Sequence, residues 1–130
     1  ASLLNTLFEK GYIPVVSSVG CDANKKTLNL NADNVASAIA QHLGAEKLIY
    51  LTDVDGLLLK KKLQSELTLK KAKSAIKSSD VSGGMVPKLD CAVRAIENGV
   101  KKVHIINGTL EHAVLLEVFT DGGVGTMIST

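Results

Sequence analysis

Long apolar runs are absent from the sequence: none approaches the roughly 18 residues that a membrane-spanning helix needs. The first residues also lack the basic region and apolar stretch of a secretory signal. The two cysteines, Cys21 and Cys91, belong to no metal-ligand pattern and imply no disulfide-forming compartment. We therefore expect reduced thiols, no membrane partner and a cytoplasmic location, or a plastid location if the source is a photosynthetic eukaryote.

Strong charge of either sign is also missing. The 130 residues carry a formal net charge of +2 and the lysines are scattered, so a nucleic-acid partner is not predicted. Hydrophobic residues make up 45% and charged residues 22%, which is ordinary for globular proteins. A chain of this size can bury one continuous core, so we expect residues 1–130 to form a single domain.

Several familiar functional motifs are absent as well. No Walker A loop occurs, and no G-x-G-x-x-G follows a strand, which argues against P-loop and dinucleotide-binding sites. The three histidines lack zinc-site spacing relative to the cysteines, so no metal site is predicted, and His42 is interpreted as a surface residue of a helix. No Gly-x-Ser-x-Gly sequence marks the nucleophile of a hydrolase.

The apolar periodicity predicts alternating strands and helices. Strands are expected at residues 13–19, 48–52, 103–106 and, as an edge strand, 126–128, with a hairpin at 20–29. Helices are expected before Gly11 and at residues 31–43, 68–78, 87–98 and 110–118, with an irregular segment at 57–69. Strand, helix and strand in this order require a parallel crossover. The predicted class is therefore α/β: a three-layer αβα sandwich with a mainly parallel open sheet.

Buried faces follow from the same periodicity. The first strand, at 13–19, is apolar throughout and is expected to be covered on both faces. The helix at 31–43 has Asn31 as its predicted N-cap and Gly44 just past its end. The apolar stripes predicted for this helix and for the helix after Pro87 are Val35, Ala38, Ile39 and Leu43, and Leu89, Ala92, Val93 and Ile96.

Polar residues follow the predicted strands, and open α/β sheets bind ligands beyond the carboxyl ends of their strands. The first group is Asn29, Asn31 and Asp33, where two amides and a carboxylate gather at the start of a helix. The amides can orient a polar substrate and Asp33 can position ammonium groups. Taken alone, however, this segment is better interpreted as a helix cap with a favourable first-turn charge.

Two further segments have the composition of a nucleotide site. Residues 52–57 run from a strand end through two acidic residues to a glycine, although an Asx turn explains this pattern equally well. Residues 82–88 place Gly83 and Gly84 before a helix that carries Lys88 in its first turn. The glycines let backbone N–H groups approach a phosphate, and a lysine at this position opposes the helix dipole unless an anion is present. This segment favours a phosphate ligand over an ordinary turn.

Taken together, four segments resemble the acetylglutamate kinases, members of the amino acid kinase family, and the resemblance runs along the whole chain. The segments are N-L-N-A-D at 29–33, G-A-E-K-L-I-Y-L-T-D-V-D-G-L at 44–57, S-G-G-M-V-P-K at 82–88 and F-T-D-G-G-V-G-T-M-I at 119–128. No single segment would suffice. The resemblance implies the amino acid kinase fold and transfer of a phosphoryl group from MgATP to the γ-carboxylate of N-acetyl-L-glutamate in arginine biosynthesis.

The resemblance also implies roles for individual residues. Asn29 would contact the acetylated amino acid, Asp33 would organise catalytic lysines, and Lys88 would stabilise the transferring phosphoryl group. The implied nucleotide site consists of Asp53, Val54, Asp55, Gly56, Leu57, Asp80, Val81, Ser82, Gly84 and Met85. L-Arginine is implied as a feedback inhibitor, with His104, Glu117 and Gly123 as its site, although a strand-end histidine and a surface glutamate explain the first two equally well.

One departure from the family pattern matters. The resemblance implies a homo-oligomeric enzyme whose amino-terminal half supplies a second catalytic lysine, another glycine pair and a substrate-binding arginine, and none of these occurs in residues 1–130. We therefore expect the chain to be the carboxyl-terminal, ATP-binding domain, with weak nucleotide binding and no turnover by itself. Two alternatives stay open: a sister kinase acting on another small substrate, and a non-catalytic nucleotide- or arginine-binding module.

Overall fold

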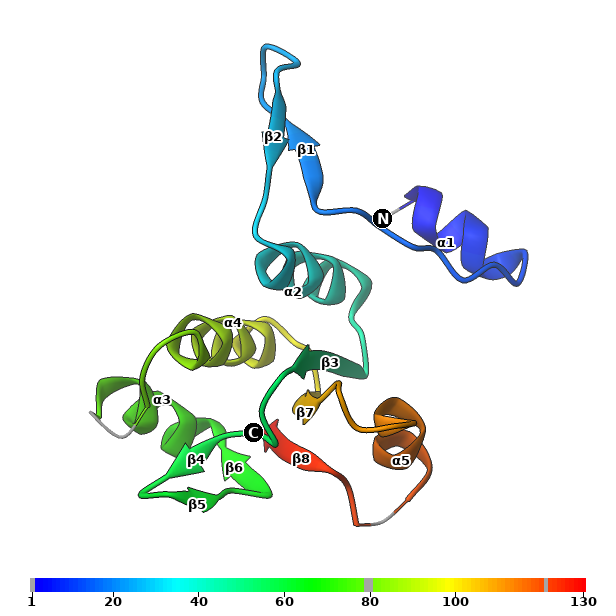
Figure 1. Cartoon of the computed structure of the whole chain (residues 1–130). Coiled ribbons are helices and arrows are strands. Elements are labelled where there is room, and N and C mark those ends of the chain that lie inside the picture. Colours follow the sequence, from blue (N-terminus) through cyan, green and yellow to red (C-terminus); the bar gives the residue numbers. More distant parts are fainter. Residues whose placement is uncertain (1, 79–80, 121) are drawn as a thin grey trace.

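The computed structural model describes residues 2–78, 81–120 and 122–130 and has an α/β fold (Figure 1). Its helices are α1 (Ser2–Glu9), α2 (Ala32–Leu43), α3 (Leu69–Lys77), α4 (Met85–Glu97) and α5 (Ala113–Phe119). Its strands are β1 (Val19–Cys21), β2 (Thr27–Asn29), β3 (Lys47–Thr52), β4 (Leu58–Leu59), β5 (Lys62–Leu63), β6 (Glu66–Thr68), β7 (Lys102–Asn107) and β8 (Gly125–Ser129).

The main sheet has four strands in the order β3-β7-β8-β6. β3 pairs with β7 in parallel, β6 pairs with β8 in parallel, and β7 and β8 are antiparallel. The predicted α/β class with a mainly parallel sheet is therefore confirmed. β1 with β2, and β4 with β5, form two small antiparallel hairpins outside this sheet.

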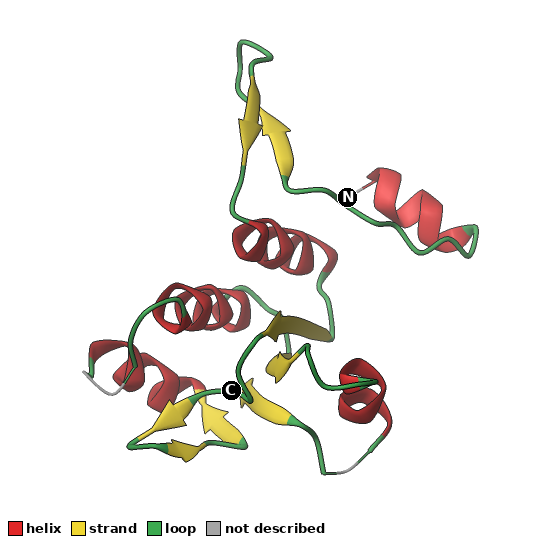
Figure 2. Cartoon of the chain, viewed as in Figure 1, coloured by secondary structure: helices red, strands yellow, loops and turns green. Residues whose placement is uncertain are grey.

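Helices lie on both sides of the main sheet (Figure 2). Alternate residues of β7 point to opposite faces, and Val103 and Ile105 join the core that the buried side of α4 completes. His104, on the other face, contacts Glu117 of α5. The buried residues of α4 include all four that its periodicity predicts, Leu89, Ala92, Val93 and Ile96. The layered arrangement follows from this alternation.

Helix α2 begins and ends where its local sequence predicts. The Asn31 side chain accepts a hydrogen bond from the Asn34 N–H at 3.1 Å, and Gly44 ends the helix in the left-handed conformation with φ of 59°. Its buried face differs from the prediction, because Ser37 and Ala40 are its buried residues. Most of the predicted stripe instead lines an open apolar groove, together with Pro14 and Val16.

The strand predicted at residues 13–19 is wrong for most of its length. Only Val19 belongs to a strand, and Ile13 and Val15 are 91% and 97% exposed rather than covered on both faces. A strand needs a neighbour for its backbone groups, and β2 is the partner of this region among the described residues. Figure 1 shows α1 and the following segment lying away from the four-stranded sheet.

Two further predictions, for the later strands of the chain, are wrong. The strand predicted at an edge, β8, lies inside the sheet between β7 and β6. The segment predicted to be irregular contains the β4–β5 hairpin and β6, which is itself an edge strand. None of the described helices is long and apolar enough to cross a membrane.

Candidate active site

The centre of the candidate site is an ion pair between Asp33 and Lys88. Asp33 lies in the first turn of α2, and Lys88 lies in the first turn of α4. The Lys88 ammonium donates hydrogen bonds to both carboxylate oxygens of Asp33, at 2.9 and 2.8 Å, although the residues are 55 positions apart in the sequence. The Asp33 side chain is 31% exposed and the Lys88 side chain is 14% exposed, so a ligand can reach the pair.

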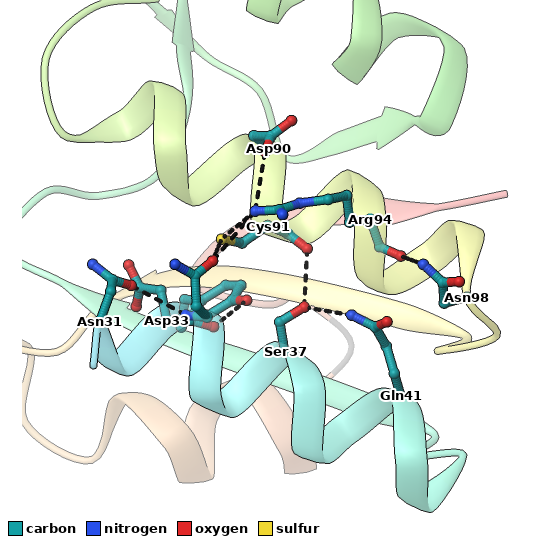
Figure 3. Close-up of polar contacts among 10 residues, drawn as sticks. Asn31, Asp33, Ser37, Gln41, Asp90, Cys91, Arg94 and Asn98 are labelled. Atoms are coloured by element: carbon teal, nitrogen blue, oxygen red, sulfur yellow. Dashed lines mark hydrogen bonds and ion pairs between the residues drawn. The ribbon is translucent and has the colours of Figure 1, made fainter. Parts of the chain in front are cut away.

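The pair forms because α2 and α4 pack against each other (Figure 3). The buried Ser37 hydroxyl donates to the backbone carbonyl of Cys91 at 3.3 Å. The Asn34 side-chain oxygen accepts from the Cys91 thiol at 3.0 Å and from the Arg94 guanidinium at 3.3 Å. These bonds join the two helices beside Asp33 and fix the distance between their first turns.

Tyr50 of β3 lies beneath the ion pair and is 3% exposed. Its hydroxyl donates to the backbone carbonyl of Asp33 at 3.2 Å, and the Lys88 ammonium lies 5.0 Å from the centre of its ring. Burial raises the pKa of Tyr50 well above its ordinary value, so the hydroxyl stays a donor at neutral pH. Sequence reasoning missed this residue; the available signal was a polar-tipped aromatic within a buried strand.

The glycine-rich turn precedes α4 as predicted. Gly83 has a φ of 62°, and a methyl group built on Gly83 or Gly84 would meet nothing within 4 Å, so the backbone is open above this turn. Gly84 caps α4 without any side-chain hydrogen bond. Ser82 is exposed, Val81 is buried and Met85 packs against the core. The predicted site residue Asp80 lies outside the described residues.

Lys88 was expected to need an anion because of its position in a first helical turn. In the structure its charge is instead met by Asp33. The helix N-terminus and the open turn remain available next to this pair. The arrangement therefore joins backbone N–H groups, one cation and one carboxylate at the place where two helices begin.

The segment after β3 divides into exposed and buried parts. Asp53, Val54 and Asp55 are exposed, and Asp55 accepts a hydrogen bond from the Asn107 side chain at 2.8 Å. Gly56 and Leu57 are buried, and the Leu57 N–H donates to the Thr126 hydroxyl at 2.8 Å. Sequence reasoning missed Asn107 and Thr126, which attach this loop to β7 and β8.

Gly56 is required at its position for two reasons. Its φ of 141° is unfavourable for residues with a side chain, and an added methyl group would come within 2.7 Å of the Thr126 hydroxyl oxygen. Asn29, the predicted contact for the acceptor substrate, is the exposed last residue of β2. The hairpin that carries it projects from the body of the chain (Figure 1).

A second cluster of polar residues lies on the opposite face of the sheet, around His104 and Glu117. These side chains are 5% and 8% exposed, and the His104 Nδ1 is in hydrogen-bond contact with Glu117. The other carboxylate oxygen of Glu117 accepts from the Val124 N–H at 2.7 Å. Gly123 has a φ of 53°, and an added methyl group would lie 3.2 Å from Glu117.

These three predicted effector residues line one cavity of about 480 Å³, together with Lys47, Glu66 and Lys102 among others. The His104 Nε2 is buried without a hydrogen-bond partner among the described residues. Burial of an unpaired polar atom is unfavourable, and this nitrogen has almost no solvent-accessible surface. The cavity itself is lined by side chains of both signs of charge.

Comparison with known proteins gives one family match and several close relatives. The sequence model of the amino acid kinase family matches residues 1–107. The acetylglutamate kinase of Lawsonia intracellularis is 55% identical over 128 residues, which cover 98% of this chain and 43% of that protein. The acetylglutamate kinase of Nostoc punctiforme is 52% identical over 130 residues, which cover 97% of this chain and 44% of that protein. The chain thus spans less than half the length of these relatives.

Solved structures show the same arrangement of elements. N-acetylglutamate synthase from Neisseria gonorrhoeae, complexed with coenzyme A and L-arginine, has a TM-score of 0.92 at 32% identity, over 98% of this chain and 30% of that chain. Giardia carbamate kinase has a TM-score of 0.75 at 24% identity, over 99% of this chain and 47% of that chain. The second similarity concerns the fold alone.

Proposed function

Because the chain belongs to the amino acid kinase family, we propose that it is the carboxyl-terminal, nucleotide-binding domain of an acetylglutamate kinase. The observation that carries this proposal is the Asp33–Lys88 pair at the adjoining starts of α2 and α4. It is supported by about half-identical acetylglutamate kinases that cover nearly the whole chain. The reaction belongs to arginine biosynthesis and transfers the γ-phosphoryl group of ATP to the γ-carboxylate of N-acetyl-L-glutamate.

In this proposal the chain acts mainly by positioning and by charge stabilisation. An acceptor oxygen forms a bond to the γ-phosphorus while the bond to the ADP oxygen breaks, and negative charge spreads over the equatorial oxygens. Lys88, in the first turn of α4 just after the open glycine turn, stabilises those oxygens with its ammonium group, while Asp33 keeps the ammonium in place. Backbone N–H groups at the start of α4 add favourable potential for phosphates.

The remaining assignments divide between the two substrates. Asn29 contacts the acetylated amino acid. The nucleotide site comprises Asp53, Val54, Asp55, Gly56, Leu57, Asp80, Val81, Ser82, Gly84 and Met85. Within it Leu57 holds the loop rather than touching the nucleotide, because its side chain is 1% exposed and its backbone groups bond to Thr126 and Gln64.

Magnesium enters this proposal as part of the nucleotide substrate. Among the described residues, no group of three or more His, Cys, Asp or Glu side chains could hold a metal ion. Magnesium in kinase sites is typically bound by phosphate oxygens, water and one or two carboxylates. MgATP is therefore the form of the nucleotide expected at this site.

The domain assignment is supported by an uncovered apolar region. Ile13 and Val15 are almost fully exposed, and the residues that follow each of them, Pro14 and Val16, line the apolar groove along α2. Isolated exposed apolar residues are ordinary, whereas a contiguous apolar region indicates an interface. We assign this region to contact with an amino-terminal domain that supplies the rest of the active site. The cytoplasmic location and the homo-oligomeric state stay predictions.

A second ligand, L-arginine, is proposed for the cavity around His104 and Glu117. A carboxylate forms strong charge-assisted hydrogen bonds with a guanidinium or α-amino group. The gonococcal synthase that shares this fold at 32% identity is complexed with L-arginine. Titrating arginine against the wild type and Glu117→Ala should raise the melting temperature of the wild type alone. No arginine-dependent shift in the wild type would exclude this site.

The catalytic proposal is tested by assaying the complete enzyme, meaning this chain joined to the remaining length that its relatives possess. We expect ADP formation that depends on N-acetyl-L-glutamate and exceeds that with glutamate, aspartate or carbamate. A preference for one of these other acceptors would support a sister kinase instead. Nucleotide binding without ADP formation with any acceptor would support a non-catalytic module.

A further inference from the structure

We propose that Tyr50 is a positioning residue that holds both Asp33 and Lys88 for phosphoryl transfer. The proposal rests on the function assigned above and adds a residue to it. Tyr50 occupies the fourth position of β3 and is one of the least exposed side chains in the described chain, at 3%. From the central sheet, it contacts both members of the ion pair.

The two contacts of Tyr50 come from different parts of its side chain. The hydroxyl donates to the Asp33 backbone carbonyl at 3.2 Å and so connects the first turn of α2 to the sheet. The ring lies 5.0 Å from the Lys88 ammonium, within the range of a cation–π interaction. One rigid side chain therefore positions both the first turn of α2 and the ammonium group of Lys88 on α4.

The ring contact suits a lysine that must also bind phosphate oxygens. An ammonium group has three N–H donors, and two hydrogen bonds go to the carboxylate oxygens of Asp33. The Tyr50 ring attracts the positive charge of the Lys88 ammonium without accepting a hydrogen bond from it. The third N–H of the ammonium therefore stays available for a phosphate oxygen. Lysine is also a flexible four-carbon side chain, and a fixed ring beneath its end restricts where the charge can go.

A purely structural role makes a different prediction. Val103 lies on β7, the strand paired with β3, is 0% exposed, and belongs to the same core cluster as Tyr50. It has no polar group and no ring with which to hold the ion pair. If Tyr50 only filled the core, its replacement would resemble a replacement of Val103 and would lower the melting temperature without a specific effect on turnover.

The test compares Tyr50→Leu, Tyr50→Phe and the control Val103→Ala in the complete enzyme at saturating substrates. We expect Tyr50→Leu to lower kcat about five- to thirtyfold, with KM values for ATP and acetylglutamate changed less than about threefold. Tyr50→Phe keeps the ring and should retain kcat within about fivefold, because a neutral hydrogen bond is lost. Val103→Ala should lower the melting temperature and leave the kcat of folded enzyme within about twofold.

A second series keeps the change of packing small. Phenylalanines carrying an increasing number of fluorine atoms at position 50 keep the ring while weakening the negative face that attracts a cation. We expect kcat to fall steadily with each fluorine added. Equal kcat across this series, or equal effects of Tyr50→Leu and Val103→Ala on kcat, would overturn the role of Tyr50 while wild-type activity still upheld the kinase. An inactive wild-type enzyme would instead remove both proposals.

Discussion

At the scale of single residues, the charged groups of the site are more exposed than the groups that hold them. Lys88 and Asp33 keep partial access to solvent, whereas Tyr50 beneath them is buried. Water screens a partly exposed ion pair and limits its contribution to folding stability. A role of the ion pair in ligand binding, at the point where two helices begin, therefore explains its presence better than a large contribution to folding stability.

The buried phenol of Tyr50 makes stability depend on alkaline pH. Its folded-state pKa is raised by burial above the ordinary value of about 10. A raised folded pKa gives a contribution that is complete below the unfolded pKa and is lost as the pH rises above it. We expect the free energy of unfolding to fall less steeply between about pH 9 and 11 in Tyr50→Phe than in the wild type, as measured by urea denaturation.

Tyr12 provides the control, because it is the other tyrosine of the chain and is 61% exposed. Tyr12→Phe should change the free energy of unfolding by no more than about 0.5 kcal/mol, because substitutions of exposed side chains usually have small effects. Identical alkaline slopes for Tyr50→Phe and the wild type would contradict the burial assigned to Tyr50.

At the scale of secondary-structure elements, the close approach of β7 and β8 depends on Gly125. A methyl group at this position would lie 2.3 Å from the Ile105 carbonyl oxygen and 3.0 Å from the Ile106 Cα. Both atoms are backbone, so the strands would have to separate. We expect Gly125→Ala to reduce the free energy of unfolding by about 1–3 kcal/mol or more, as measured by chemical denaturation.

Gly122→Ala is the matched control for this prediction. Gly122 precedes the same strand, and an added methyl group would meet nothing within 4 Å. Its replacement should change stability by no more than about 0.5 kcal/mol. Equal losses of stability in Gly122→Ala and Gly125→Ala would show that the close contact between β7 and β8 does not determine the cost of replacing Gly125.

Elements defined by local signals were predictable from the sequence, and elements defined by distant partners were not. Helix α2 begins at a capping asparagine and ends at a left-handed glycine, both readable within one segment. The strand predicted at residues 13–19 failed because its apolar sequence does not specify a neighbour. β6 was missed because it is three residues long and pairs with β8, far along the chain.

The same distinction applies to the candidate site. The family resemblance directed attention to Asp33 and Lys88, and the fold brings them together. Tyr50 and Thr126 were missed, because their roles depend on hydrogen bonds to residues 17 and 69 positions away. Such contacts follow from strand order and helix packing, which no local pattern in this sequence specifies.

At the scale of the whole molecule, the four-stranded sheet has a compact core while the amino-terminal region has an exposed apolar surface. We expect the isolated 130 residues to bind MgATP weakly and to give no measurable turnover, because the proposed amino-terminal domain supplies further catalytic residues. Calorimetric titration measures the binding, and a coupled assay of ADP formation measures the turnover. Robust kinase activity of the isolated chain would contradict the domain assignment.

The central claim is that Asp33 and Lys88 act as one unit in phosphoryl transfer. The most direct test is the kcat of the complete enzyme carrying Lys88→Ala, Asp33→Ala or both changes, with acetylglutamate and MgATP saturating. We predict a loss of about 100-fold or more for Lys88→Ala, and a double variant little worse than the single ones, because residues that act as a unit are not additive. Near-wild-type turnover of Lys88→Ala, or fully multiplicative losses in the double variant, would contradict the account.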